Sequence, residues 1–361
     1  MKSFMLQNPK NTICITGGAG FIGCNLIHLL IKEFSVKIIN IDKLTYAGNL
    51  ESLQEVQDNE RYIFEQVDIC DQVQISRILE KYKPIAFLNL AAESHVDRSI
   101  DSPEEFIKTN ILGTYNLLEC IRMYYKNLND TQKSEFRFLH VSTDEVFGSL
   151  GKDDYFTETT PYQPNSPYSS SKASSDHLVR AWQHTYGIPT LITNCSNNYG
   201  PYQFPEKLIP LNIYNALQNK PITIYGNGSN VRDWIFVEDH CRGVLKVLTD
   251  GSVGESYNIG SNNEKNNLEL IELICKLLDE IQPRPDLKSY KEQITFINDR
   301  PGHDQRYAID ASKMKNNLNW ESQESLESGL RKTIDWYLNN SGWLKRIMSG
   351  EYQGQRLGVS V

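Results

Sequence analysis

Tyr168 and Lys172 have the types and the spacing of a pair that could move a proton. They stand four residues apart in the run Pro167-Tyr-Ser-Ser-Ser-Lys172, and the residues that follow have a helical pattern, so both side chains would lie on one helix face. A free tyrosine has a pKa of about 10, and lowering it by about 3 units takes roughly 4 kcal/mol. A neighbouring ammonium group contributes to that stabilisation. The spacing therefore predicts a tyrosine base supported by a lysine, with a chance pair on an exposed helix as the alternative.

Asp144 and Glu145 are a second candidate, because they place two carboxyl groups next to each other. Two carboxyls that repel each other and differ in burial can divide the roles of proton donor and proton acceptor. On their own, adjacent acids more often solvate a loop or cap a helix. They follow the apolar run 136–141 closely, and ligands of open α/β sheets bind at the carboxyl ends of the strands. Beside the tyrosine, the two acids would suit acid/base chemistry.

Glycines supply a third pattern, in the run Gly17-Gly-Ala-Gly-Phe-Ile-Gly23 between a short apolar run and a helical stretch. Glycines in such a turn let backbone N–H groups approach a pyrophosphate at the helix N-terminus. Asp42 ends the next apolar run, roughly 20 residues later, where an acid would hold the adenosine ribose and repel the extra phosphate of NADP. These residues predict an NAD site, although the adjacent Lys43 could tolerate a phosphate.

Short apolar runs alternate with helical stretches along the first half of the chain, which predicts a parallel sheet covered on both faces. The fold class that we expect is α/β, a Rossmann-type doubly wound parallel sheet with a smaller C-terminal α+β substrate-binding lobe. The NAD-binding domain would span 1–196, with 233–260 threading back into it. The lobe would comprise 197–232 and 261–361. The predicted strands are 13–16, 36–42, 62–67, 85–90, 136–141, 190–194 and 255–259.

Composition limits the classes of function. The formal net charge of −8 argues against a general nucleic-acid binder. The seven cysteines follow no framework spacing and fit reduced thiols in the cytoplasm. No run approaches about 20 apolar residues, so we expect no membrane association. The histidines show no ligand spacing, so no metal site is expected.

Longer runs in the chain resemble the nucleotide-sugar 4,6-dehydratases of the extended short-chain dehydrogenase/reductase family, in particular those that act on dTDP-glucose. The resemblance covers nearly the whole chain. It implies NAD as cofactor, dTDP-glucose as substrate and a homodimer joined through helices near 107–122 and 170–186. The matching runs are Leu90-Ala-Ala-Glu-Ser-His-Val-Asp-Arg-Ser99, Asn194-Cys-Ser-Asn-Asn-Tyr-Gly-Pro201, Phe204-Pro-Glu-Lys-Leu-Ile-Pro210, Arg232-Asp-Trp234 and Asp299-Arg-Pro-Gly-His-Asp304.

The same resemblance implies a role for each catalytic residue. Tyr168, supported by Lys172, would remove the proton of the sugar 4-hydroxyl group, to which Thr143 would hydrogen-bond. Glu145 would take the C5 proton, and Asp144 would protonate the departing C6 oxygen. Dehydration would follow the oxidation of C4 because a C4 ketone acidifies the C5 proton.

Binding residues are carried over from the family by position. The implied cofactor contacts, together with the glycine turn, are Gly17, Gly20, Phe21, Ile22, Gly23, Asp42, Lys43, Leu44, Thr45, Asp68, Ile69, Ala91, Ala92, Thr109, Tyr168, Lys172 and Asn198. The implied substrate contacts are Ser94, Thr143, Asn197, Lys207, Leu208, Tyr225, Arg232, Asn267, Arg300 and His303, with Tyr352 as a candidate contact for the base.

Two other functions share part of this pattern. A nucleotide-sugar 4-epimerase would need the cofactor turn and the tyrosine–lysine pair but not the adjacent acids at 144 and 145. A non-catalytic NAD-sensing protein could dispense with Tyr168 and Lys172. A turnover assay on nucleotide-activated glucoses and mannoses separates these functions and also tests the base preference, which the residues do not settle.

Overall fold

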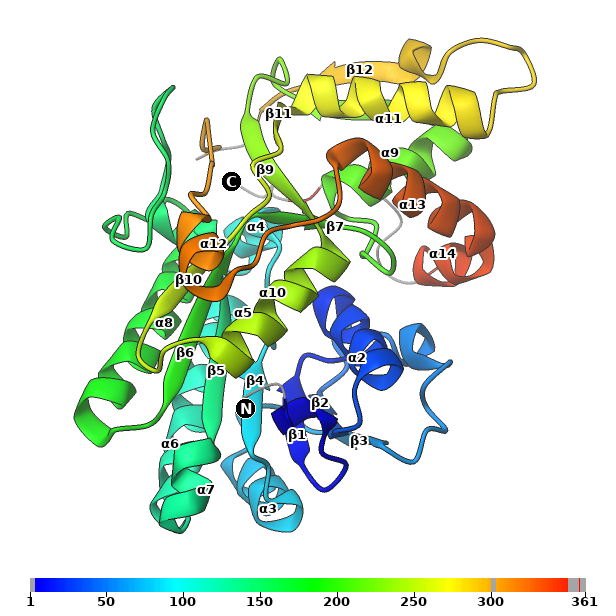
Figure 1. The fold of residues 1–361 in the computed structure, drawn as a ribbon. Coiled ribbons are helices and arrows are strands. Elements are labelled where there is room, and N and C mark those ends of the chain that lie inside the picture. The colour runs from blue at the N-terminus through cyan, green and yellow to red at the C-terminus, as the bar shows by residue number, and fades with distance from the viewer. Residues whose placement is uncertain (1–3, 300–302, 350–356, 358–361) are drawn as a thin grey trace.

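A seven-stranded parallel sheet forms the centre of the protein (Figure 1). The computed structural model describes residues 4–299, 303–349 and Leu357. The strands lie in the order β10-β6-β5-β4-β1-β2-β3, and every neighbouring pair is parallel. Their bounds are β1 Thr12–Thr16, β2 Lys37–Asp42, β3 Tyr62–Gln66, β4 Ala86–Asn89, β5 Arg137–Thr143, β6 Thr190–Cys195 and β10 Ser256–Ile259. The predicted strands and the doubly wound fold are confirmed, with β5 extending two residues beyond its predicted end, to Thr143.

The direction in which the chain builds the sheet reverses between β1 and β4. From β1 the chain continues to β2 and β3 on one side, and from β4 it continues to β5 and β6 on the other. At such a switch point the connections leave in opposite directions and open a crevice at the carboxyl ends of the strands. The fold therefore places its ligand crevice beside the glycine turn that follows β1.

Helices cover both faces of the sheet (Figure 1). On one face, α2 and α10 pack against side chains such as Ile13, Ile15 and Ile38. On the other, α3, α6 and α8 pack against Cys14, Ile39 and their neighbours. Successive strand residues point to opposite faces, so near-continuous apolar strands serve both layers. The bounds are α2 Phe21–Glu33, α3 Gln72–Tyr82, α6 Thr114–Lys126, α8 Pro167–Tyr186 and α10 Val237–Asp250.

Helix α8, which carries the tyrosine and the lysine, has well-defined ends. Ser166 caps it by accepting the N–H of Ser169, whose hydroxyl accepts the N–H of Ser166 in return, and Pro167 occupies the first turn. Such a box satisfies backbone donors that the first turn leaves open. Gly187 ends the helix in the left-handed region at φ 69°. These caps fix the register of the helix face that carries Tyr168 and Lys172.

The C-terminal part of the chain has a second hydrophobic core. Two small sheets and four helices enclose side chains such as Ile209, Trp234, Leu270 and Leu330. The strands pair as β11-β9-β7 and β12-β8. The bounds are β7 Asn197–Tyr199, β8 Ile222–Tyr225, β9 Val231–Phe236, β11 Glu264–Asn266, β12 Ile294–Ile297, α9 Leu208–Leu217, α11 Asn267–Ile281, α13 Leu326–Asn339 and α14 Ser341–Ile347.

The segment 233–260 divides between the two cores. α10 packs against α2, and β10 extends the large sheet by pairing with β6. The beginning of the segment lies in β9, which pairs with β7 and β11 instead. The boundary between the two predicted domains stays a prediction.

Short elements complete the described chain. The helix expected over 107–122 is interrupted, because Ile107–Gly113 (η2) is a π-helical segment that continues into α6. Its Asn110 side chain bonds the backbone of Glu93 and the hydroxyl of Ser171. None of the described helices is both long and apolar enough to cross a bilayer. The remaining bounds are α1 Phe4–Gln7, η1 Leu50–Leu53, α4 Val96–Asp101, α5 Pro103–Phe106, α7 Asp130–Glu135, η3 Asp144–Phe147, η4 Tyr290–Gln293 and α12 Ser312–Leu318.

Candidate active site

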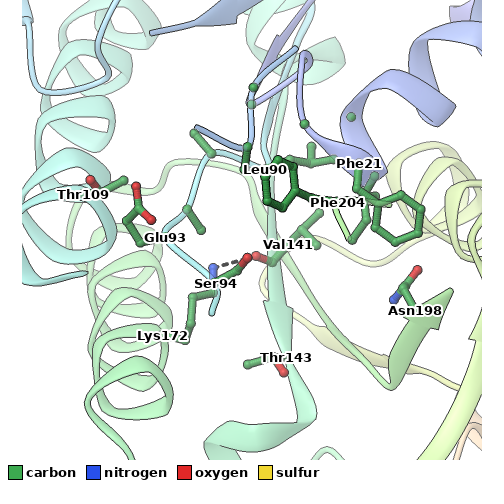
Figure 2. A pocket seen from close by; sticks show the side chains of 18 of the residues that line it. Phe21, Leu90, Glu93, Ser94, Thr109, Val141, Thr143, Lys172, Asn198 and Phe204 are labelled. Carbon is green, nitrogen blue, oxygen red and sulfur yellow. Dashed lines mark hydrogen bonds between the residues drawn. The ribbon is translucent and has the colours of Figure 1, made fainter. Parts of the chain in front are cut away.

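A cleft of about 290 Å³ lies at the carboxyl ends of the central strands and brings the three sequence patterns together. The glycine turn forms one part of its wall, and residues 141–145, Tyr168 and Lys172 form another. Figure 2 shows Thr143 and Lys172 on one side and Phe21 and Phe204 on the other. Residues far apart in the sequence therefore share one cavity at the switch point of the sheet.

The glycine turn has a backbone that other residues would not fit. Gly17 has φ 69°, and a Cβ atom there would lie 2.8 Å from the backbone of Ala91. A Cβ atom at Gly23 would collide with the carbonyl oxygen of Gly17. Gly20 caps α2 without a side chain, so the N-terminus of the helix stays accessible to an anion.

Asp42, the last residue of β2, lines the cleft together with the glycine turn. Its carboxylate accepts the N–H of Ala19 at 3.0 Å and that of Leu44 at 2.8 Å. Burial raises the pKa of Asp42, and the two backbone bonds oppose that shift. Next to it, Lys43 pairs with Asp68 at 3.5 Å. Leu44 and Asp68 are therefore adjacent to the cleft but do not line it.

Tyr168 and Lys172 are both buried on the same face of α8. Lys172 Nζ donates to the carbonyl of Val141 at 2.8 Å (Figure 2). The neighbouring Thr143 hydroxyl acts to lower the pKa of Tyr168. Burial, and after it the charge of Glu145, raises the pKa of Tyr168 well above its usual value. The protein groups around this phenol therefore favour its protonated form.

Thr143, Asp144 and Glu145 are held by the end of β5. Thr143 is the last residue of the strand and caps η3 by accepting the N–H of Glu145 at 3.3 Å. Its hydroxyl also donates to Asp144 Oδ1 at 3.3 Å. Asp144 is almost wholly buried, whereas Glu145 is half-buried. Burial, then Glu145 and Asp233, raises the pKa of Asp144 well above its usual value, so Asp144 is suited to hold a proton.

The wall of the cleft contains polar atoms suited to a ligand. Among the described residues, Asp144 Oδ2, Asn197 Oδ1 and Asn198 Oδ1 are buried and have no hydrogen-bond partner. Buried polar atoms are normally bonded to protein or to a ligand. Together with the glycine turn, which leaves room only for a bare backbone, these atoms fit a bound dinucleotide and a polar substrate.

Comparison with known proteins identifies the family. The family model described as GDP-mannose 4,6 dehydratase matches residues 14–333. A dTDP-glucose 4,6-dehydratase of Neisseria meningitidis is 58% identical over 96% of this chain and 99% of its own length. The chain belongs to the dTDP-glucose 4,6-dehydratase family. A second relative of the same name, from Escherichia coli K12, is 57% identical over 94% of this chain and 96% of its own.

Solved structures agree with this placement. A dTDP-glucose 4,6-dehydratase of Streptomyces venezuelae, solved with NAD bound, has a TM-score of 0.85 and 41% identity, covering 93% of this chain and 99% of that one. That of Bacillus anthracis, solved in complex with NAD, has a TM-score of 0.83 and 45% identity with the same coverage. A UDP-glucose 4-epimerase of Thermotoga maritima is 29% identical with a TM-score of 0.80, over 91% of this chain and 99% of its own. The fold is shared with epimerases, and the higher identities are with dehydratases.

In this dTDP-glucose 4,6-dehydratase fold, the predicted substrate residues fall into two groups. Ser94, Thr143, Asn197 and Lys207 line the cleft. Lys207 Nζ donates to the carbonyl of Ser94 at 2.8 Å, which joins two of the segments that line the cleft. Leu208 begins α9 directly after Lys207 but is not part of the lining.

The second group lies on the smaller sheets. Tyr225 ends β8, and its ring is 6.3 Å from that of His303. Arg232 lies in β9 and donates to the carbonyl of Asp304 at 2.9 Å. Asn267 is the first residue of α11. None of these four lines the cleft. Arg300 and Tyr352 lie outside the described residues.

Several residues of the dehydratase cleft carried no predicted role. Glu93, Cys195, Gln203, Phe204 and Glu206 all line it. All but Gln203 belong to the family-like runs, so their neighbours in sequence were the available signal. Cys195 is buried at the end of β6, and burial raises the pKa of its thiol to about 12. In the described ranges, no cluster of His, Cys, Asp or Glu is arranged to hold a metal ion.

Proposed function

We propose that this protein converts dTDP-glucose to dTDP-4-keto-6-deoxyglucose with NAD as its cofactor. The observation that carries the proposal is the position of Asp144 and Glu145. They share one cleft with the glycine turn and with Tyr168. An epimerase needs the last two features but no adjacent pair of acids. When bound, NAD accepts the hydride from C4 and returns it at C6, and its positive ring opposes the burial that raises the pKa of Tyr168.

Tyr168 and the residues around it carry out the first proton transfer, from the C4 hydroxyl group of the sugar. Tyr168 takes the proton of the C4 hydroxyl group, and the Thr143 hydroxyl, which lines the same cleft, orients that group. The Lys172 ammonium supports the phenolate from the same helix face. Burial lowers the pKa of Lys172, and the nearby Asp176 carboxylate opposes that shift. A fixed negative charge behind the lysine therefore favours its protonated form.

Asp144 and Glu145 carry out the elimination that follows. Glu145 removes the proton from C5, which the C4 ketone has acidified. The C5–C6 double bond forms as the C6 oxygen leaves, and Asp144 donates its proton to that oxygen to give water. Once the hydride has been returned to C6, Glu145 gives a proton to C5 and the double bond is saturated. The raised pKa of Asp144 is what a proton donor at neutral pH requires. Their unequal burial divides the two roles.

We assign the ligand contacts on the same basis. The dinucleotide would lie along the glycine turn, Asp42 and Asn198, and the sugar nucleotide would reach from Thr143 past Lys207 toward Arg232. The larger sheet would thus carry the cofactor and the C-terminal part the nucleotide. Arg232 is a forked donor suited to a diphosphate.

We also propose a cytoplasmic homodimer. The dimer would use α8 and the segment from η2 through α6. Large apolar side chains remain exposed there, at Ile107, Leu112, Tyr115, Met123 and Tyr186. Exposed apolar patches of this kind are typical of protein interfaces. Sedimentation of the protein and of a Leu112→Glu variant tests the dimer, and a monomeric wild type would exclude it.

Incubation with dTDP-glucose in heavy water tests the reaction. Mass spectrometry should find a product lighter by one water and carrying deuterium at C5, because C5 takes a solvent-derived proton after the hydride has returned to C6. A product with the mass of dTDP-glucose and inverted C4 would establish an epimerase instead. No turnover with any nucleotide-activated glucose or mannose would contradict the proposal.

A further inference from the structure

Three separate segments outside the central sheet line part of the cleft. The segment after β2 contributes Thr45 and Gly48, and the segment after β4 contributes Glu93 and Ser94. The segment before α9 contributes Gln203, Phe204, Glu206 and Lys207. They are distant in sequence, and none belongs to the central sheet. A ligand in the cleft is enclosed only while these three segments stay together.

Glu206 joins the three segments through one buried carboxylate. Its Oε2 accepts from Arg98 Nε at 2.9 Å, and its Oε1 accepts from the Tyr46 hydroxyl at 3.1 Å. The Glu206 side chain is only 2% exposed. The Arg98 guanidinium also lies 3.8 Å from the centre of the Tyr46 ring. Each segment therefore supplies one member of a closed triangle of contacts.

Two further contacts strengthen the junction. The imidazole of His95 is 3.3 Å from the Glu206 carbonyl oxygen, and the rings of Tyr46 and Phe204 meet edge to face at 5.5 Å. Phe204 itself lines the cleft (Figure 2). Tyr46 and Arg98 are absent from the lining, whereas Glu206 is part of it, so two members of the triangle stand behind the wall and hold the third in place.

We infer that Tyr46, Arg98 and Glu206 form a clamp that retains the dinucleotide in the cleft between turnovers. This inference rests on the proposed function, in which the cofactor ends each cycle in the form in which it began and has no need to exchange. Separating the segments would leave a buried carboxylate without its guanidinium partner, and such a charge is strongly disfavoured. The clamp residues are positioning residues, since their role is to hold three segments of the wall together.

Exchange of bound NAD measures the clamp independently of catalysis. Protein loaded with radiolabelled NAD is chased with excess unlabelled NAD and filtered at intervals. Glu206→Gln keeps the shape but removes the charge, and Arg98→Ala removes the partner; we expect each to exchange roughly tenfold faster or more, which is about 1.4 kcal/mol in the barrier. Tyr46→Phe loses one neutral bond and should exchange about threefold faster. Arg331→Ala is the matched control, because its ion pairs with Glu280 and Glu327 lie on exposed helices.

The outcomes separate the clamp from the proposed function. Wild-type protein that binds no NAD would contradict the function itself. Wild-type exchange rates in folded Glu206→Gln and Tyr46→Phe would overturn the clamp alone, as would faster exchange in Arg331→Ala to the same extent. Melting temperatures report folding, and Tyr46→Phe, which loses only a hydroxyl group, decides the question if the charge variants do not fold. If the variants have lower melting temperatures but exchange NAD at the wild-type rate, the triangle contributes only to stability, and the inference is wrong.

Discussion

Nε2 of His140 lies 3.4 Å from Oδ1 of Asp176, and both side chains are fully buried behind the catalytic face of α8. The other oxygen of Asp176 accepts from Ser142 Oγ at 2.8 Å and from the Tyr162 hydroxyl at 2.8 Å. On its other side, His140 meets the Asn89 amide at 3.1 Å. This network ties β4 and β5 to α8 directly beneath Lys172, one turn away from Asp176.

Replacing Asp176 with Asn should therefore impair proton transfer by Tyr168. The groups that face this carboxylate are His140 from β5, Lys172 from α8 and Tyr162, with Arg180 behind Tyr162. Without the negative charge, burial would lower the pKa of Lys172 further. We expect kcat to fall by roughly tenfold to a hundredfold and the alkaline limb of the pH–rate profile to move to lower pH.

The pH profile separates this electrostatic role from a structural one. A variant that is only destabilised would lose activity at every pH, and the alkaline limb of its pH–rate profile would stay at the wild-type position. Asp250→Asn, which removes an exposed ion pair with Lys246, should leave the profile unchanged.

Glu145→Gln and Asp144→Asn should fail at different steps. Glu145→Gln loses the base, so C5 should exchange no deuterium while C4 oxidation remains measurable. Asp144→Asn loses the donor, so C5 exchange should persist while water loss slows by about 10²–10⁴-fold. Mass spectrometry of the sugar after incubation in heavy water measures both the deuterium exchange at C5 and the loss of water. Retained dehydration by Glu145→Gln would assign the base to another residue.

Gly17 and Gly187 offer a matched test of the glycine turn. Both have φ 69°, but a Cβ atom at Gly17 would lie 2.8 Å from Ala91, whereas one at Gly187 would meet nothing within 4 Å. Gly187→Ala should lower the free energy of unfolding by about 1–2 kcal/mol and leave NAD affinity unchanged. Gly17→Ala should cost more stability and reduce NAD affinity at least tenfold, as titration would show. Equal NAD affinity in the two variants would argue against the turn as the pyrophosphate site.

Two buried histidines predict that the folded protein loses stability as the pH falls. Burial lowers the pKa of His140 to about 4 and that of His240 to about 3. Both are neutral in the fold, whereas an unfolded histidine gains a proton below pH 6.5. The unfolded state therefore binds more protons, and the free energy of unfolding should fall as the pH drops from 6.5 toward 4, by about 1.4 kcal/mol per pH unit for each histidine.

Urea denaturation at pH 6.5, 5.5 and 4.5 measures this slope. Neither ring nitrogen of His240 has a hydrogen-bond partner among the described residues, so His240→Leu should remove about half of the slope. Asp144 and Asp233, whose pKa values burial raises, act in the opposite direction and are unchanged in this comparison. An identical slope in wild type and His240→Leu would show that His240 does not contribute.

The sequence determined those features whose physics is local. The glycine turn, the alternation of strands and helices, and the spacing of Tyr168 and Lys172 on one helix face all depend on neighbours a few residues apart. The interruption at 107–113 was not predictable in this way, because Asn110 there bonds Glu93 and Ser171 from other segments.

Only the tertiary structure decided which of these features meet. Thr143 and Tyr168 line one cleft because β5 and α8 pack against each other, and no pattern along the chain encodes that packing. The Asp176–His140 pair and the Tyr46–Arg98–Glu206 triangle join residues that are far apart in the sequence. Their strength comes from burial, which raises the cost of an unpaired charge, and burial is a property of the folded chain alone.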